Sequence, residues 1–153
     1  MALKKGCAHC EAKGEDRLWQ GSEFRVVLVH DTGFDGWCRV IWNKHVSELT
    51  DLSEDNRHTI LEAVVALEEA LRAELAPFKI NIASLGTGAP HLHFHVIPRF
   101  EDDPTFPDPV WLAPSKASSR PLPEGFHDRM RGRLVDRLGP MATDSSARAD
   151  EAR

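Results

Sequence analysis

The sequence predicts one α+β domain, in which an antiparallel sheet packs on one long helix and an irregular C-terminal arm follows. Four short runs are rich in β-branched and apolar residues, as strands are, and one longer run repeats its apolar residues at helical spacing. Strands and helices do not alternate strictly, which favours an antiparallel sheet over a parallel, doubly wound one. With 153 residues and 41% hydrophobic content, one domain can bury a sizeable core.

Two strands are expected at 24–30 (FRVVLVH) and 37–42 (WCRVIW). The Gly-containing break DTGFDG between them is typical of a turn, so we expect these strands to pair antiparallel. Two further strands are expected at 79–85 (KINIASL) and 91–99 (HLHFHVIPR), with the turn-forming residues 86–90 between them.

An amphipathic helix is expected between these two pairs of strands. Its apolar positions recur at steps of three and four residues, with Glu and Arg between them: Ile60, Val64, Leu67, Leu71 and Leu75. Ser53 is a suitable N-cap, and Pro77 ends the helix because proline cannot continue it.

The chain changes character after Phe100, where prolines recur at Pro104, Pro107, Pro109, Pro114, Pro121 and Pro123. These keep the segment irregular before an expected short helix at 123–138. We divide the chain into a domain at 1–114, an arm or short helix at 115–140 and a tail at 141–153. The tail is small and charged with nothing to bury, so we expect it to be disordered.

The composition argues against two classes of partner. A net charge of −5 does not suit a surface that neutralises nucleic acid or an anionic membrane, because either needs clustered Lys and Arg. No apolar run approaches the roughly 20 residues that cross a bilayer, and residues 1–14 lack the apolar stretch of a signal peptide. We therefore expect a soluble, cytoplasmic protein that binds neither nucleic acid nor membrane.

The most informative motif is a run of alternating histidines: His91, His93 and His95. On a strand, these three imidazoles would project from one face, about 6 to 7 Å apart, while the apolar residues between them enter the core. Such a row lines one edge of a pocket with proton-transfer groups. The alternative is a polar sheet face whose histidines are solvated or bonded to backbone.

The run HLHFHVIPR, followed by a Pro-rich stretch with a Trp, resembles the His-φ-His-φ-His-φ-φ signature of the histidine triad superfamily. The order of strand, Asp31, strand, WNKHV, helix, Asn81, Gly-containing turn and triad is similar to that family over about 7–111. The part beyond Pro114 lies outside the resemblance. Within the superfamily, NIASLG followed by PHLHFHVIPRF most resembles a bacterial branch described as diadenosine tetraphosphate hydrolase-like.

The resemblance implies a role for each histidine. His93, in the middle, corresponds to the family's nucleophile, whose neutral imidazole attacks the α-phosphate and forms a phosphoramidate that water resolves. His95 would contact the α-phosphate and the bridging or leaving oxygen. His91 would fix the tautomer of its neighbours, relayed to His45 in WNKHV. An alternative for His45 is a hydrogen bond to a backbone carbonyl near the helix.

The resemblance also implies substrate-binding residues. Asp31 would accept hydrogen bonds from ribose hydroxyls, although an Asp before Thr-Gly is also an ordinary turn residue. Asn81 would bind phosphate or orient water. The backbone N–H groups of Gly86, Thr87 and Gly88 would approach phosphate oxygens. Thr87 stands where many members carry Gln or Asn, which is expected to alter the rate or the leaving-group preference.

Cys7 and Cys10 have the two-residue spacing that supplies half of a tetrahedral zinc site. By resemblance to some family branches and to the related galactose-1-phosphate uridylyltransferases, His45 and His91 would complete it. A structural zinc would take the same two imidazoles that the hydrogen-bond relay needs. A third alternative is a pair of packed or exposed thiols. The chemistry itself requires no cofactor.

Taken together, the resemblance implies an enzyme that hydrolyses or transfers a nucleotidyl group, acting on purine nucleotides or dinucleoside polyphosphates. It also implies a two-fold homodimer formed through the long helix and the adjoining strand, with Trp111 on the partner subunit or over a base. The same residues suit an AMP-binding or sensing module with incidental turnover. A metal hydrolase with an open zinc position is disfavoured, because no carboxylate or third histidine has a matching spacing.

Overall fold

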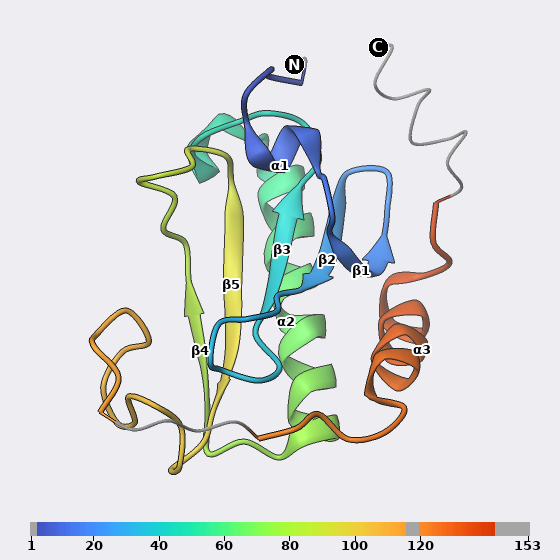
Figure 1. The fold of residues 1–153 in the computed structure, drawn as a ribbon. Coiled ribbons are helices and arrows are strands. Elements are labelled where there is room, and N and C mark those ends of the chain that lie inside the picture. Colours follow the sequence, from blue (N-terminus) through green and yellow to red (C-terminus); the bar gives the residue numbers. More distant parts are fainter. Residues whose placement is uncertain (1–2, 116–119, 143–153) are drawn as a thin grey trace.

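The computed structural model describes residues 3–115 and 120–142. Within these residues, one antiparallel sheet has the strand order β1-β2-β3-β5-β4, and the long helix α2 lies behind it in Figure 1. The strands are β1 (Asp16–Gln20), β2 (Phe24–Leu28), β3 (Cys38–Trp42), β4 (Lys79–Ala83) and β5 (His93–Arg99). The predicted α+β fold, an antiparallel sheet packed on one long helix, is confirmed.

The long helix α2 (Glu54–Leu75) begins and ends where the sequence predicts. The Ser53 hydroxyl accepts a hydrogen bond from the Asn56 N–H at 3.2 Å, which satisfies one of the free amides of the first turn. Ala76 then takes a left-handed conformation, and Pro77 follows. Short helical segments lie at α1 (Ala8–Glu11) and η1 (Leu49–Asp51).

Alternation along the strands gives the sheet two different faces. Val40 of β3 and Val96 of β5 are fully buried in the core that contains the apolar face of α2. Successive side chains on a strand point to opposite sides, so their neighbours point away from α2. Among these, Arg39 lies directly opposite His95 in the register of β3 and β5.

Three features differ from the sequence prediction. The strand β1 was not predicted, because its residues DRLWQ are mostly polar and a bulge at Leu18, between the paired residues Arg17 and Trp19, breaks its alternation. The helix α1 is too short to leave a periodic pattern. The last strand begins at His93 rather than at His91, so the first histidine precedes the strand.

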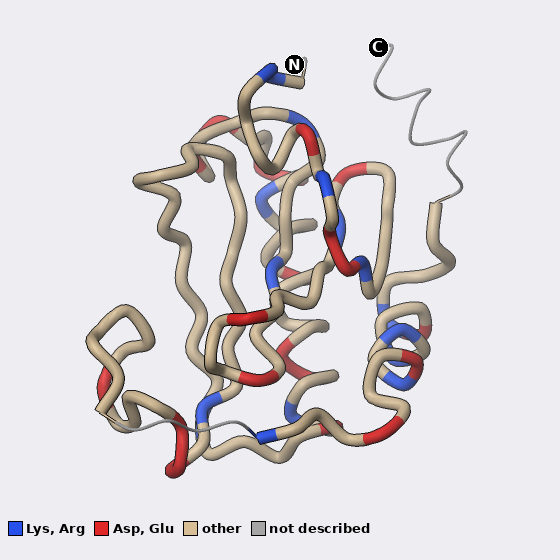
Figure 2. The backbone as a smooth tube through the Cα atoms, viewed as in Figure 1, with Lys and Arg blue, Asp and Glu red and all other residues tan. Residues whose placement is uncertain are grey.

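The C-terminal part adds the helix α3 (Phe126–Leu138), which contacts α2 and β1. Its buried residues join the same core: Phe126, Met130 and Leu134. Figure 2 shows several basic residues on α3, and three of its arginines bond Glu74 or Glu69 of α2. Of the predicted tail, residues 143–153 lie outside the described residues. No helix among the described residues is both long and apolar enough to span a bilayer.

Candidate active site

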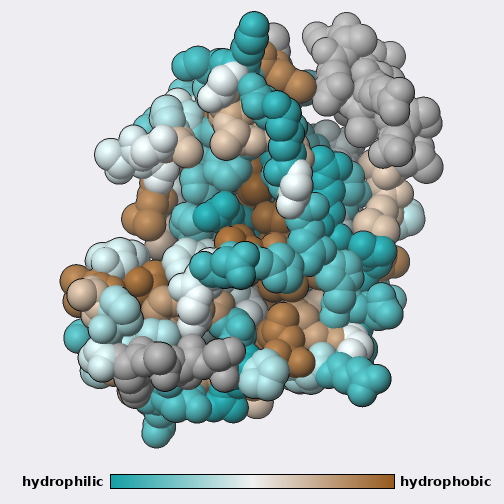
Figure 3. Space-filling model, in the orientation of Figure 1, coloured by the Kyte–Doolittle hydropathy of each residue, from teal (hydrophilic) through white to brown (hydrophobic). Residues whose placement is uncertain are grey.

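His93 and His95 lie side by side on β5, on the sheet face that points away from α2. Both are buried, and their ring centroids are 4.9 Å apart in an edge-to-face arrangement. The space-filling view of this side of the molecule is hollowed near its centre (Figure 3). The strand therefore brings two buried imidazoles to one place, as its alternating pattern predicts.

The tautomer of His93 is set by the main chain. Its Nδ1 lies 2.5 Å from the carbonyl oxygen of His91. A carbonyl can only accept, so Nδ1 carries the proton and Nε2 keeps its lone pair. Burial lowers the pKa of His93 below its ordinary value, and nearby Arg39 lowers it further. His93 is therefore a neutral imidazole with a free Nε2, the state that an attacking nucleophile needs.

The tautomer of His95 is the opposite one. Its Nδ1 accepts a hydrogen bond from the indole Nε1 of Trp37 at 3.0 Å and a weaker one from the Nε of Arg39 at 3.4 Å. Because Nδ1 accepts, the neutral ring carries its proton on Nε2. Burial is the main cause that lowers the pKa of His95 to about 4, and repulsion by Arg39 and by His93, when His93 is protonated, adds to it. His95 can therefore donate a hydrogen bond from Nε2 at neutral pH.

The sequence did not point to Trp37 or Arg39. Trp37 directly precedes β3 and Arg39 is its second residue, and alternation places both on the face opposite Cys38 and Val40. The alternating strand pattern was the one local signal that placed these two residues on the triad face. That their side chains meet His95 depends on the register between β3 and β5, which is a tertiary feature.

A fourth histidine, His9, was also missed. It lies on α1 between the two cysteines, is 9% exposed, and its ring centroid is 4.5 Å from that of His93. Burial is the main cause that lowers its pKa to about 4, so this ring is neutral as well. No local pattern marks His9, because only the docking of α1 on the sheet brings it to the triad.

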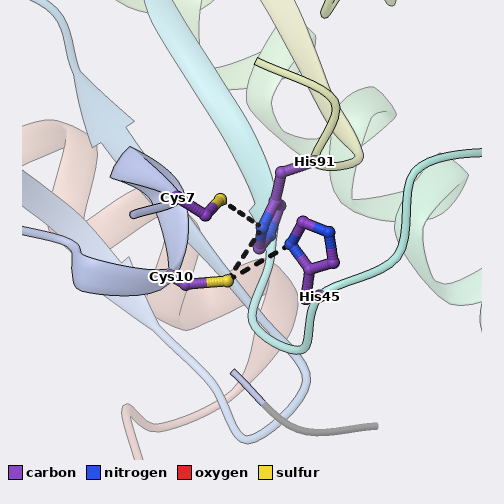
Figure 4. A group of neighbouring side chains, drawn as sticks. All are labelled: Cys7, Cys10, His45 and His91. Carbon is purple, nitrogen blue, oxygen red and sulfur yellow. Dashed lines mark hydrogen bonds between the residues drawn. The ribbon is translucent and has the colours of Figure 1, made fainter. Parts of the chain in front are cut away.

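The predicted metal ligands do lie together. Cys7 and Cys10 come from the α1 segment, His45 from the loop after β3 and His91 from the loop before β5, and their side chains converge (Figure 4). One ligand atom from each lies within 4.8 Å of all the others. The His91 Nδ1 is 3.4 Å from both sulfurs, and the His45 Nδ1 is 3.4 Å from the Cys10 sulfur.

These distances fit a tetrahedral zinc ion. Zn–S bonds of about 2.3 Å and Zn–N bonds of about 2.05 Å place the sulfur and nitrogen atoms about 3.6 Å apart. The His91 Nε2 donates to the Trp42 carbonyl at 2.5 Å, so the lone pair on Nδ1 faces the thiols. A backbone carbonyl on the far nitrogen is the usual way in which a metal-binding histidine is oriented.

The same contacts bear on the predicted hydrogen-bond relay. The rings of His45 and His91 lie edge to face at 5.2 Å, and no hydrogen bond joins them among the described residues. Both nitrogens of His91 already face other partners, the Trp42 carbonyl and the thiols. His91 holds the proton of His93 through its carbonyl oxygen, not through its imidazole. The arrangement suits metal ligands better than a relay.

The loop before the triad borders a cavity of about 300 Å³, which Gly86, Thr87, His91 and His93 help to line. Gly86 has a φ of +91°, and a Cβ there would lie 3.1 Å from the Ala89 carbonyl oxygen. Only glycine suits this position. The amides of Thr87 and Gly88 make no hydrogen bond among the described residues, which leaves them available to an anion.

Two predicted binding residues make no hydrogen bond to the triad histidines within the described residues. The Asn81 side-chain oxygen accepts a hydrogen bond from Arg99 at 2.8 Å, so this oxygen is already engaged. Asp31 follows β2 in a left-handed conformation, with a φ of 58°, and its exposed carboxylate has no hydrogen bond within the described part of the chain. No hydrogen bond there joins either residue to His93 or His95, although Asn81 lies opposite Ile97, on the sheet face of the triad.

The chain is similar to known proteins, both in its match to a family model and in its fold. The HIT domain family model matches residues 14–102, while no curated protein matches the chain. A histidine triad protein from Marinobacter aquaeolei VT8 is 25% identical, with a TM-score of 0.67 over 92% of this chain and 100% of its own.

Two further structures share the fold. A histidine triad (HIT) protein from Sinorhizobium meliloti 1021 is 24% identical, with a TM-score of 0.64 over 83% of this chain and 92% of its own. A Zn-bound histidine triad family protein from Mycobacterium smegmatis is 21% identical, with a TM-score of 0.60 over 86% of this chain and 94% of its own.

Proposed function

This chain belongs to the HIT domain family, and we propose that it hydrolyses or transfers a nucleotidyl group by cleaving at the α-phosphate of its substrate. The proposed substrates are nucleoside phosphates and dinucleoside polyphosphates, as in the diadenosine tetraphosphate hydrolase-like branch. The single observation that carries the proposal is the pair of opposite tautomers on β5: a free Nε2 on His93 beside an Nε2–H on His95.

The two tautomers suit the two sides of one displacement. The lone pair of the His93 Nε2 attacks the α-phosphorus, a P–N bond forms, and the P–O bond to the leaving group breaks. The Nε2–H of His95 donates a hydrogen bond to the oxygen that takes up the electron pair. Water then attacks the nucleotidyl-histidine and the electron pair of the P–N bond returns to His93, while a water proton goes to solvent.

The free amides of Thr87 and Gly88 support a phosphate-binding role for the loop that borders the triad cavity. The carboxylate of Asp31 is exposed and has no hydrogen bond within the described residues, which is compatible with the proposed ribose contact. Asn81 is proposed to act at the edge of the site through its free amide N–H groups, because Arg99 occupies its oxygen.

We further propose a structural zinc held by Cys7, Cys10, His45 and His91. The distances among these side chains support it, and the similar Mycobacterium smegmatis protein is Zn-bound. Four protein ligands leave no open position, so the ion would hold α1 and two loops together without taking part in the reaction. α1 carries His9, so this zinc would also hold His9 against His93.

The deciding experiment incubates the purified protein with diadenosine tetraphosphate and, separately, with adenosine phosphoramidate, and resolves the products. We expect AMP from both. Rapid quench with labelled substrate should capture an acid-labile nucleotide on the wild-type chain. Protein that binds AMP tightly but releases no product and forms no adduct would leave only a nucleotide-binding module.

A further inference from the structure

The arginines on the triad face of the sheet include Arg25, Arg39 and Arg99, and the first and last of these are neutralised within the protein. Arg25 of β2 donates to both oxygens of Glu15 at 2.7 Å. Arg99 of β5 donates to the two oxygens of Asp103 at 2.7 and 3.0 Å. Each of these two residues is 3% exposed, and each guanidinium also donates a hydrogen bond to a backbone carbonyl. Their charges are therefore committed to the fold.

The third arginine, Arg39, is placed differently. It is half-buried beside His95, and its Nε makes one weak hydrogen bond, 3.4 Å long, to the His95 Nδ1. A guanidinium has five N–H donors, so the other four have no partner among the described residues. No carboxylate lies within ion-pair distance of Arg39 in that part of the chain. Burial lowers the pKa of Arg39, and the charge of Glu15, which Arg25 already binds, opposes this only from beyond ion-pair distance. A bound anion would therefore stabilise this half-buried charge.

Among the described residues, Arg39 is a positive charge beside His95 that no carboxylate contacts directly. The His93 Nδ1 is engaged by the His91 carbonyl and the His95 Nδ1 by the Trp37 indole, so neither hydrogen bond supplies a charge that could hold a phosphate. Phosphates of a bound nucleotide are anionic, and the planar fork of arginine suits their oxygens better than a lysine ammonium does. The nearest formal positive charge that a substrate phosphate could meet beside His95 is therefore Arg39.

We propose that Arg39 binds the phosphate oxygens of the leaving group and thereby selects substrates whose leaving group is a phosphate chain over those that release an amine. The inference rests on the proposed function, which it makes more specific. When His93 displaces a phosphate chain, the electron pair of the broken P–O bond stays on the departing oxygen, and Arg39 offsets this charge. When an amine departs, the broken bond is P–N, the amine nitrogen takes up a proton from water, and no anionic oxygen develops for Arg39.

The test compares Arg39→Gln with wild type on diadenosine tetraphosphate and adenosine phosphoramidate. A hydrogen bond to a charged group contributes about 1.5 to 3 kcal/mol, which corresponds to a roughly ten- to hundredfold loss of kcat/KM on the polyphosphate. The phosphoramidate should lose less than about threefold. Arg39→Lys keeps the charge but not the planar fork of donors. Its kcat/KM on the polyphosphate should therefore lie between those of wild type and Arg39→Gln. Arg72→Gln, on α2 across the sheet, controls for the lost surface charge.

Two further measurements separate substrate binding from orientation of His95. Trp37→Phe removes the stronger donor to the His95 Nδ1 and should slow both substrates alike. In Arg39→Gln this indole bond remains, so the tautomer of His95 is kept. Calorimetric titration should show that wild type binds α,β-methylene-ATP more tightly than AMP, and that Arg39→Gln loses at least about tenfold of that preference.

The results that would overturn the proposed function differ from those that would overturn the role of Arg39 alone. Wild type that turns over neither compound would overturn the proposed function and, with it, the leaving-group preference. Wild type that turns over both, with Arg39→Gln slowing both equally or neither, would overturn the role of Arg39 alone. Unchanged preference for α,β-methylene-ATP over AMP in Arg39→Gln would also refute it.

Discussion

At the scale of single residues, the proposed chemistry depends on which nitrogen of each buried imidazole carries a proton. The His91 carbonyl directs the lone pair of His93 to Nε2, and the Trp37 indole directs the proton of His95 to Nε2. Neither arrangement requires a charged partner. Both hold while the two rings stay neutral, as burial favours.

Replacement of His93 by Ala removes the atom that would bond to phosphorus. We expect kcat to fall by about three or more orders of magnitude, as it does when covalent nucleophiles are lost, while the Kd for AMP changes less than about fivefold. Steady-state rates and calorimetric titration measure the two effects. His95→Ala should slow the reaction through the loss of one donor to the leaving oxygen, which is worth about 3 to 4 kcal/mol. A His93→Ala enzyme with a near-normal rate would rule out the covalent mechanism.

His95 also makes stability depend on pH. Its pKa is about 4 in the folded chain against an ordinary 6.5, so the unfolded chain binds more protons between these values. The free energy of unfolding should therefore fall as the pH drops from 6.5 to about 4, by about 3 kcal/mol from His95 alone. His93 and Arg39, which face this ring, oppose its protonation.

Urea unfolding of wild type and His95→Gln at pH 7 and at about pH 4 tests this dependence. Gln keeps an acceptor for Trp37 but does not titrate, so the variant should lose less stability on acidification than wild type. The difference between wild type and variant in the stability lost on acidification removes the contributions of other histidines and of any zinc ligand. Parallel losses in both proteins would show that His95 is not the source.

At the scale of elements, α1 is too short to be stable alone, and the four Cys and His side chains give it an anchor. We expect about one zinc per chain, with Zn–S near 2.3 Å and Zn–N near 2.0 to 2.1 Å by X-ray absorption. Cys10→Ser should lose most of the metal and lower the melting temperature. Cys38→Ala, in the core and outside the cluster, should keep the metal although it also costs stability.

Removal of zinc should affect stability more than chemistry, because four protein ligands leave no position for substrate. Dialysis against a chelator, followed by thermal melting and by rates at a temperature where the protein stays folded, separates the two. Purified protein without metal, with unchanged melting in Cys10→Ser, would favour hydrogen-bonded thiols instead.

At the scale of the whole molecule, large apolar side chains are exposed near the edge of the sheet that β4 forms. On the α2 side these include Ile82 of β4, 45% exposed, and Leu61 and Val65 of α2. Phe78 and Trp111 are exposed as well, at 65% and 62%. An edge strand with unpaired backbone groups beside apolar residues is suited to pairing with another chain. We therefore propose the homodimer through the helix and adjoining strand.

Sedimentation velocity at micromolar concentration should give the mass of two chains for wild type. Ile82→Glu places a charge in the proposed interface and should give a monomer that stays folded, because Ile82 is outside the buried core. Glu62→Gln, an exposed polar change on α2, serves as the matched control and should remain a dimer. A monomeric wild type would contradict the dimer without affecting the active site.

The sequence by itself determined the elements whose pattern is local. The helical repeat and the Ser53 cap defined α2, and alternation placed His93 and His95 on one face of a strand. The paired cysteines predicted half of a four-residue cluster that the structure brings together. Such features follow from periodicity and short spacing, which neighbouring residues specify without help from the rest of the chain.

Only the tertiary structure decided what surrounds these residues. Arg39 and His95 are far apart in the sequence, and they meet because β3 and β5 pair in one register and not another. The docking of α1 likewise brings His9 to His93. The polar strand β1 forms because β2 offers it an edge to pair with. The sequence identified the imidazoles, but their tautomers and the arginine beside them depend on strand pairing and burial, which no local pattern records.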